Sequence, residues 1–179
     1  KTGSDSKRIP WTANQVTHLV NACAAKNDVE LLNITLLAAH TGARVEELAT
    51  LLVSSIHLSD TIPYFQITKS KTNAGLRNVP VHPYIYPLLE KMVNQSTNRF
   101  LFSNLKMTFH QERSAAISKR FGRLKTKLGY GANQVFHSFR HTAMTMFEQA
   151  GVNEKEEFTI NAYPNPVKKI ITVQGGKGA

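Results

Sequence analysis

Apolar residues along this chain recur at the spacing of one helix face over long stretches, and they predict a series of α-helices. The first begins after Thr12, where Gln15 three residues later completes a capping-box pattern. Its apolar face holds Val16, Leu19, Val20 and Cys23. The second runs from a cap at Asp28 to Gly42 and is apolar nearly all round, which predicts the central buried helix. A short third helix begins near Arg44 and carries Leu48, Leu51 and Leu52.

The period of the pattern changes after Asp60. Two short stretches rich in aromatic and β-branched residues predict strands at 64–68 and 77–81. The residues between them include Asn and Gly, which favour turns, and also Lys69 and Lys71. The sequence therefore predicts a β-hairpin with basic residues near its tip, and Arg77 begins its second strand. The predicted fold class is mainly α with a small antiparallel β-hairpin or sheet (α+β).

Three more helices are predicted at 84–93, 111–128 and 137–150. The first has Pro83 at an early position, where proline is tolerated. The second is amphipathic, with an apolar face of Ile117, Phe121, Leu124 and Leu128. Its other faces carry the basic residues Arg113, Lys119, Arg120, Arg123, Lys125 and Lys127. Glycine residues after the last two segments predict where these helices end.

The character of the chain divides it into three parts. Residues 1–10 resemble a linker or the start of an excised fragment, residues 11–153 form one domain, and residues 154–179 form an atypical tail. The tail pattern predicts a strand, a Pro-rich turn and a strand, so it is either part of a mixed domain or foreign sequence joined to it. Its Tyr163-Pro164-Asn165-Pro166 run resembles the start of a bacterial C-terminal secretion-sorting domain.

Charge narrows the choice of partner. The 179 residues contain 22 Lys and Arg against 12 Asp and Glu, a net charge of +10. This excess favours an anionic partner, nucleic acid first and an acidic membrane surface or acidic protein second, although a solvated basic surface gives the same count. The single cysteine, Cys23, excludes a disulfide within the chain and a cysteine zinc cluster. No segment has a signal peptide or membrane-span pattern, which predicts a cytoplasmic protein.

The stretch from His137 to Thr142 places two histidines and Arg140 on about one helical turn. Metal binding is one interpretation, since His137 and His141 are four residues apart. However, Ser138 stands where zinc hydrolases carry a catalytic glutamate, and Arg140 would repel a dication. A hydrogen-bonded core histidine is the structural interpretation of His141.

Phosphate binding is the second interpretation of the same residues. Arginine presents a planar, permanently charged fork that binds two phosphate oxygens at once. Arg44 and Arg140, on different helices, could clamp one phosphodiester, while a hairpin lysine such as Lys71 protonates the leaving oxygen. His137 could carry a proton near neutral pH.

These residues carry a family resemblance. The run from Thr41 to Leu48, the hairpin Ser70-Lys71-Thr72 and the run from His137 to Thr142 resemble the catalytic domain of tyrosine recombinases, the phage integrase family. The resemblance extends from about Trp11 to about Asn153. It implies site-specific DNA recombination for a mobile element, by cleavage and rejoining of double-stranded DNA through a 3′-phosphotyrosyl intermediate, with no metal or other cofactor. It also implies a homotetramer on DNA for the whole protein, whereas this piece alone could be a monomer, and it places the activity in the nucleoid.

The resemblance implies a role for each matched residue. Arg44 and Arg140 would bind the scissile phosphate, Lys71 would be the general acid, and His137 would assist proton transfer. Glu47 would orient the site, and His141 would pack. The expected DNA-binding residues, from charge and position, are Lys69, Arg77, Lys119, Arg120 and Arg123.

The nucleophile is where the pattern breaks. The family places a Gly-His or Gly-Trp pair about twenty residues after the second arginine and the tyrosine about thirty after it. This chain lacks such a pair, and its one tyrosine beyond Arg140 is Tyr163, before Pro164. Proline favours an extended conformation in the residue before it, whereas the family tyrosine usually lies on or near a helix. Tyr163 is therefore the candidate nucleophile, and the alternative is a catalytically incomplete DNA-binding fragment. A third interpretation, an adaptor for an acidic partner, has no specific motif.

Overall fold

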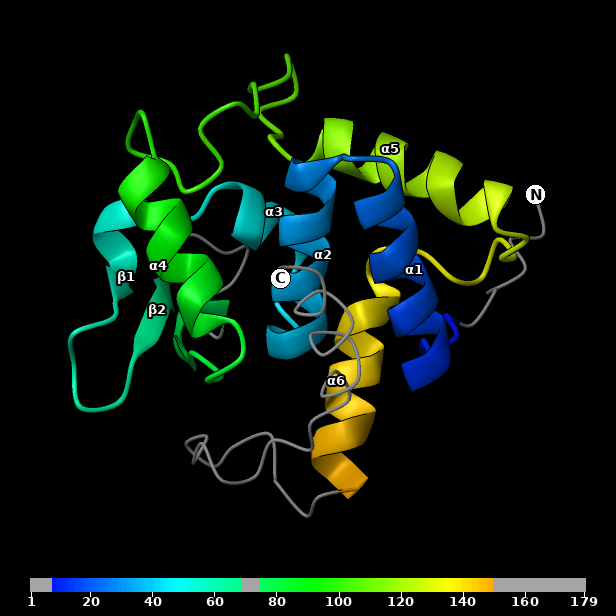
Figure 1. Ribbon diagram of the computed structural model, residues 1–179, viewed down its shortest axis with the longest axis horizontal. Coiled ribbons are helices and arrows are strands. Elements are labelled where there is room, and N and C mark those ends of the chain that lie inside the picture. Colours follow the sequence, from blue (N-terminus) through cyan, green and yellow to red (C-terminus); the bar gives the residue numbers. More distant parts are fainter. Residues whose placement is uncertain (1–7, 69–74, 150–179) are drawn as a thin grey trace, which may run out of the picture.

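The computed structural model of the protein describes residues 8–68 and 75–149 (Figure 1). Its helices are α1 (Ala13–Ala25), α2 (Val29–Thr41), α3 (Val45–Ala49), α4 (Tyr86–Gln95), α5 (Ala115–Lys127) and α6 (Ser138–Gln149), with a 3₁₀ turn at Val53–Ser55. One antiparallel sheet has the order β1 (Ile56–His57), β2 (Tyr64–Ile67) and β3 (Arg77–Pro80). Within the sheet, Phe65 of β2 pairs with Ile56 and with Val79. The predicted fold class is confirmed.

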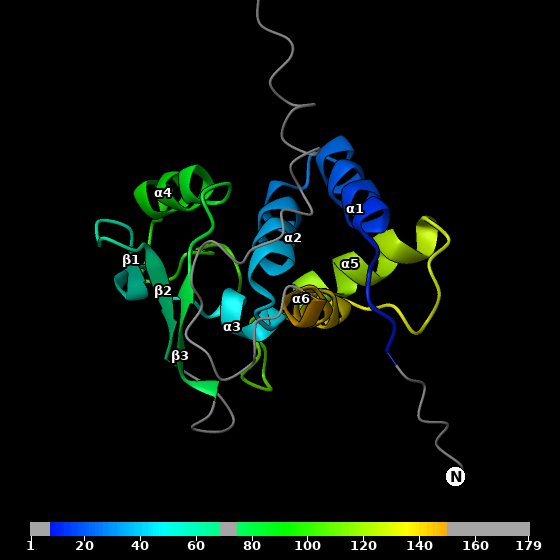
Figure 2. The ribbon, with the colours of Figure 1, turned by 90° about the horizontal axis from the view of Figure 1, so that it is seen from below.

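Helix α2 is the centre of the helical part, as its apolar sequence predicted. It contacts α1, α3, α5 and α6, and the side chains of Leu31, Ile34 and Leu37 are fully buried. Figures 1 and 2 show α1, α5 and α6 around α2, while the sheet and α4 lie on the other side of α3. Most of this helix is therefore removed from water, which agrees with its apolar sequence, while residues near its start such as Val29 remain exposed.

The predicted helix ends are confirmed where capping chemistry set them. The Thr12 hydroxyl accepts a hydrogen bond from the backbone N–H of Gln15, and the Gln15 side chain accepts one from the Thr12 N–H. Asp28 caps α2 by accepting from the Leu31 N–H at 3.1 Å. Gly42 ends α2 in the left-handed conformation, with φ of 61°. Each cap pairs backbone groups that the helix itself leaves unsatisfied.

Three predicted helix boundaries were wrong. Helix α3 ends at Ala49, so Leu51 and Leu52 lie beyond it. Leu52 pairs instead with Phe100 in an isolated β-bridge. Helix α4 begins two residues later than predicted, and its early proline is Pro87. Helix α5 begins at Ala115 and not at 111, since Gln111 has φ of 61° and cannot be helical.

The start of α6 is fastened to the first residues of the domain. Thr142 Oγ1 accepts a hydrogen bond from the Trp11 backbone N–H at 2.7 Å and also lies 3.1 Å from the Trp11 carbonyl oxygen. The Trp11 indole is buried, donates to the Val135 carbonyl, and packs against Phe121 and Phe139. These contacts fix the orientation of the helix that carries the His137–Thr142 motif.

Among the described residues, no helix combines the length and apolar character needed to cross a membrane. Cys23 is buried, and burial raises the pKa of its thiol to about 11. Such a thiol stays protonated at neutral pH and is a poor nucleophile.

Candidate active site

A glycine brings together the two helices that carry the candidate residues. A Cβ on Gly42 would lie 2.8 Å from the Ala143 Cβ of α6 and 3.9 Å from the Arg140 Cα. The Arg140 guanidinium also donates to the Gly42 carbonyl at 3.2 Å. Only a residue without a side chain allows the end of α2 to approach α6 this closely. Arg44 follows two residues later, so this contact sets the spacing between the two motifs.

Arg44 lies at the start of α3 and is paired with Glu47. Its guanidinium contacts Glu47 Oε1 at 2.7 Å, while its backbone N–H donates to Oε2 at 2.8 Å. The Arg44 side chain remains 46% exposed, whereas that of Glu47 is only 5% exposed. The buried carboxylate therefore orients an arginine that is still open to a ligand.

Arg77 of β3 completes this ion-pair group. Its guanidinium donates to both Glu47 oxygens, at 2.9 and 3.3 Å. Burial alone raises the pKa of Glu47, but the hydrogen bonds from Arg77 and Arg44 outweigh burial and lower it. Arg77 was predicted to bind DNA, and the structure shows that its fork is engaged by Glu47 instead of pointing freely to solvent. A paired Arg77 fits a positioning role.

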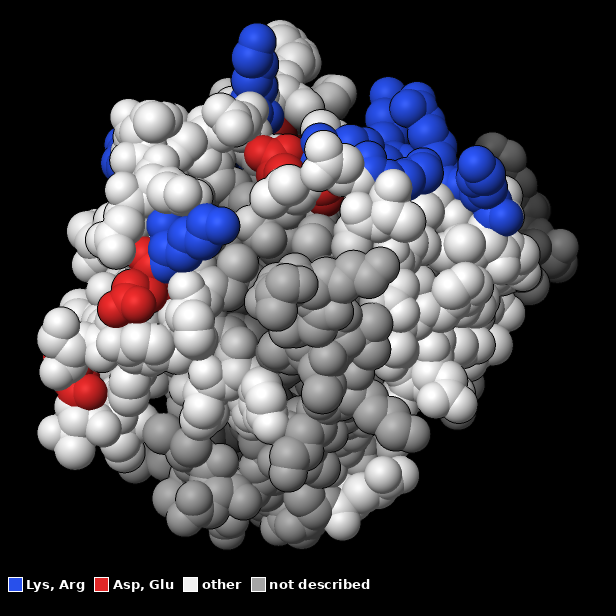
Figure 3. Space-filling model, viewed as in Figure 1, with Lys and Arg blue, Asp and Glu red and all other residues white. Residues whose placement is uncertain are grey.

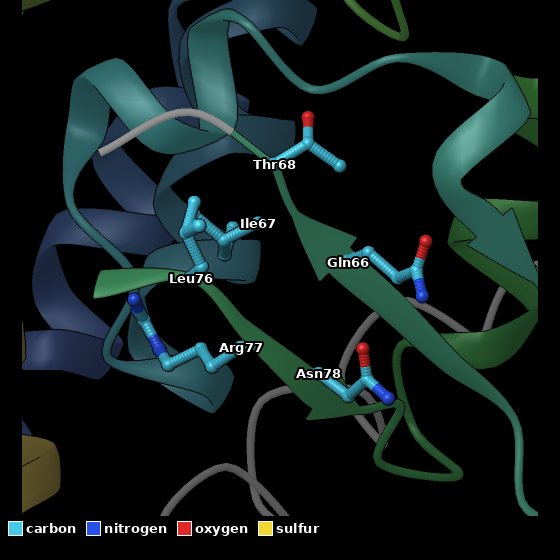
Figure 4. A pocket seen from close by; sticks show the side chains of 6 residues that line it. All are labelled: Gln66, Ile67, Thr68, Leu76, Arg77 and Asn78. Atoms are coloured by element: carbon cyan, nitrogen blue, oxygen red, sulfur yellow. The ribbon is translucent and has the colours of Figure 1, made fainter. Parts of the chain in front are cut away.

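The base of the hairpin forms an open hollow of about 550 Å³ beside Arg77 (Figure 4). Gln66 and Asn78 lie side by side along it, and Arg77 extends away from them toward the other end of β3. Thr68 and Leu76 line the same hollow, on either side of the segment that contains Lys71. The Arg77–Glu47 contact thus brings the base of this hairpin to Arg44.

His137 lies just before α6, among positive charges. Its ring packs edge-on against that of His141, with 5.2 Å between ring centroids. Partial burial, followed by the nearby His141, Arg140 and Arg44, lowers the pKa of His137. The Arg140 guanidinium bonds to Gly42, two residues before Arg44, and the Arg140 backbone N–H donates to the His137 carbonyl at 3.1 Å, so the three residues lie in one neighbourhood. A histidine kept neutral there can accept or share a proton at neutral pH.

Metal binding lacks further ligands in this region. Within residues 8–68 and 75–149, no group of three His, Cys, Asp or Glu side chains is arranged to hold a metal ion. The interpretation of His141 as a core histidine was wrong, because its side chain is exposed, and its ring packs against that of His137 instead.

The basic residues of α5 separate into two groups. Lys119 and Arg123 are exposed, and Figure 3 shows Lys and Arg atoms gathered over α5. Arg120 is instead ion-paired with Glu30 at 2.6 Å and with Asp28 at 3.5 Å. Of the DNA-binding residues predicted on this helix, Lys119 and Arg123 present their charge on the outside, and Arg120 fastens α5 to the start of α2.

Arg113 and Glu46 are structural residues that the sequence did not reveal. Arg113, predicted as part of a basic helix face, is 6% exposed and donates to the carbonyls of Ala49 and Phe102. Glu46 accepts from the backbone N–H groups of Arg113 and Ser114, at 3.0 and 2.8 Å. Lys125 is likewise buried and donates to the Gly131 carbonyl. Their only sequence signal was charge, which does not distinguish a buried anchor from a solvated face.

Three predicted site residues, Lys69, Lys71 and Tyr163, lie outside the described residues. The structure brings together Arg44, His137 and Arg140, with Glu47 and Arg77 behind them. What is assembled is a cationic group able to hold an anion with two charged oxygens.

A mainly helical domain with a small antiparallel sheet and arginines converging from α3 and α6 defines a class of protein. The model of the phage integrase family matches residues 11–156, and the chain belongs to this family. A search of curated proteins found no match. The matched region contains all of Arg44, His137 and Arg140, and no tyrosine beyond Arg140.

Solved structures share the fold. One is the crystal structure of XerA recombinase, with a TM-score of 0.62 and 18% identity, covering 100% of this chain and 67% of that chain. Another is the Tn1549 transposon integrase with transposon right end DNA, with a TM-score of 0.67 and 18% identity, covering 100% and 64%. The same integrase in complex with a circular intermediate DNA has a TM-score of 0.69 and 17% identity, covering 100% of this chain and 64% of that chain. This chain therefore spans about two thirds of the length of these proteins.

Proposed function

We propose that this domain binds double-stranded DNA and performs the strand cleavage and rejoining of site-specific recombination. The observation that carries the proposal is the convergence of Arg44, His137 and Arg140, which lie far apart in sequence, at the close contact between Gly42 and α6. The XerA protein is a recombinase and the Tn1549 protein an integrase solved with DNA, which supports DNA as the substrate. A homotetramer on DNA, acting at the nucleoid, is the assembly we propose for the whole protein.

In this mechanism, Arg44 and Arg140 hold the two non-bridging oxygens of the scissile phosphate. Their positive charge stabilises the negative charge that grows in the transition state. His137, whose pKa is lowered by partial desolvation and by the neighbouring charges, contacts the same phosphate and shares a proton. The tyrosine hydroxyl gives its proton to His137 as its oxygen bonds to the phosphorus, the bond from phosphorus to the 5′ oxygen breaks, and Lys71 protonates that leaving oxygen. The 3′-phosphotyrosyl bond keeps the bond energy for rejoining.

A second candidate is a domain that binds DNA without cutting it. The observation in its favour is that the family match ends at residue 156, before Tyr163, the one tyrosine that follows Arg140. In this form the arginines and α5 bind phosphates, and no phosphotyrosyl bond forms in this chain. We propose 11–153 as the DNA-binding domain and 154–179 as a segment outside it in either case.

The experiment that separates the two uses a nicked duplex that traps covalent adducts, analysed on a denaturing gel. A protein–DNA band that disappears with Tyr163→Phe supports cleavage by Tyr163. Binding with a steep salt dependence and no band supports the binding-only form. Arg140→Ala should reduce cleavage far more than binding, and equal losses of both would contradict its transition-state role. Absence of any DNA binding would refute both forms.

A further inference from the structure

The turn between Lys106 and Glu112 presents an aromatic side chain to solvent. The side chain of Phe109 is 94% exposed, and Met107 beside it is 43% exposed. In a folded domain a single partly exposed apolar residue is ordinary, but a nearly bare phenylalanine is not, because aromatic rings gain most from burial. Among the described residues, the one aromatic ring in contact with Phe109 is that of the adjacent His110, with 5.5 Å between the ring centroids.

Hydrogen bonds within the turn hold this projection in shape. The Thr108 N–H donates to the Glu112 carbonyl at 2.9 Å, and the Gln111 N–H donates to the Thr108 carbonyl at 3.0 Å. The Glu112 N–H also donates to the Thr108 hydroxyl at 3.2 Å. Because the backbone is already ordered, contact of the ring with a partner costs little additional conformational entropy.

The base of the turn is anchored beside the candidate active site. Arg113 is buried under it, with its guanidinium 3.8 Å from the Phe100 ring and its Nε donating to the Ala49 carbonyl. Glu46, two residues after Arg44, accepts hydrogen bonds from the N–H groups of Arg113 and Ser114. The projecting turn is thus fixed to α3, the helix that begins at Arg44.

Basic side chains outnumber acidic ones around the turn. Lys106 and Glu112 lie within it, and the exposed Lys119, Arg123 and Lys127 follow on α5. Figures 1 and 3 show the projecting segment and the basic surface of α5 along the same edge of the molecule. An apolar tip among basic side chains matches a groove of duplex DNA, where phosphates border base edges with apolar groups such as the thymine methyl.

We propose that the 106–112 turn is a DNA-reading element, in which Phe109 contacts base edges in a groove of the duplex whose phosphates are bound by α5. This inference rests on the proposed function, since it assigns a specificity determinant to the same DNA complex. Lys119 and Arg123 supply the sequence-independent attraction, and the ring supplies a contact that depends on the base beneath it.

The test measures binding of the full chain to a pool of random-sequence duplexes by fluorescence anisotropy over a series of salt concentrations. Phe109→Ala should weaken binding about tenfold, with the slope of log affinity against log salt unchanged, because an apolar contact releases no counterions. Arg123→Ala should instead flatten that slope by about 0.9, because one phosphate is no longer neutralised. Ile62→Ala truncates another exposed apolar side chain, 50% exposed and in the β1–β2 connection, and as the control it should bind like wild type.

Selection of bound duplexes from the same pool adds a second readout. Wild type should enrich a base preference that Phe109→Ala loses at one or two adjacent positions and Phe109→Trp alters. If the wild type binds DNA and Phe109→Ala binds with the same affinity and the same base preference, the inference is overturned while the proposed function stands. Self-association that disappears in Phe109→Ala, with DNA affinity intact, would identify a second copy as the partner and also overturn it. Failure of the wild type to bind any duplex would refute the proposed function and the inference with it.

Discussion

Replacing Gly42 by alanine should destabilise the domain through two separate effects. The residue has φ of 61°, and a side chain in the left-handed conformation costs about 1–2 kcal/mol. The new Cβ would also lie 2.8 Å from the Ala143 Cβ, which is fixed to the α6 backbone and cannot rotate away. Overpacking of this kind costs about 1–3 kcal/mol. The free energy of unfolding should therefore fall by about 2–5 kcal/mol, the sum of the two.

The assay is urea unfolding followed by the fluorescence of Trp11, the single tryptophan, which is buried near the contact between α5 and α6. Gly129→Ala is the matched control, because Gly129 also has a positive φ, 83°, but a Cβ added to it would have no atom within 4 Å. It should lose only the conformational part, about 1–2 kcal/mol.

A double-mutant cycle isolates the steric part. Adding Ala143→Gly to Gly42→Ala removes the second carbon of the clash, so the pair should be more stable than the sum of the two single changes by about 1–3 kcal/mol. Equal losses for Gly42→Ala and Gly129→Ala, together with additive behaviour in the cycle, would refute the close approach of α2 and α6.

The other predictions concern buried polar groups. Burial lowers the pKa of His40 from 6.5 to about 4, so the folded state resists protonation, and stability should fall by about 3 kcal/mol as pH drops from about 6.5 to about 4. His40→Leu should flatten this part of the dependence of unfolding free energy on pH, measured by urea titration. An unchanged dependence would contradict the assignment of this effect to His40. Glu47→Gln should cost about 1–3 kcal/mol at neutral pH. Because the folded-state pKa of Glu47 is lowered, its advantage is complete above the ordinary glutamate pKa of 4.5 and shrinks as pH falls through the folded-state pKa. A loss independent of pH would argue against its charge. Thr142→Val leaves the buried Trp11 N–H without its acceptor and should cost about 1–3 kcal/mol in thermal unfolding, against no loss for the exposed Thr126→Val.

The parts of the fold that the sequence predicted are those set by local chemistry. The capping box at Thr12, the cap at Asp28 and the left-handed Gly42 each act within a few residues, so their patterns are readable directly. The apolar character of α2 likewise predicted its central position. The wrong starts of α4 and α5 lie where turns decide the first residues, and periodicity alone does not report such turns.

The sequence motifs named Arg44, His137 and Arg140, which the folded chain brings close together, but they did not show how neighbouring arginines are paired. Arg77 was predicted to bind DNA, and Arg113 was placed on a basic helix face. Both instead pair with groups on α3. Arg77 bonds to Glu47, 30 residues away in sequence, and Arg113 bonds to the carbonyl of Ala49, 64 residues away. Charge on a helix or strand predicts exposure, and only the folded chain shows which arginines are satisfied internally.

The two adjacent acids of α3 have a mechanical consequence for the site. Glu46 and Glu47 point to different sides of one short helix, the first bonded to the start of α5 and the second to Arg44 and Arg77. A rotation of α3 about its axis would strain both sets of bonds at once. The start of α5 and the guanidinium of Arg44 are therefore held by the same five-residue helix, so the position of one is tied to the position of the other.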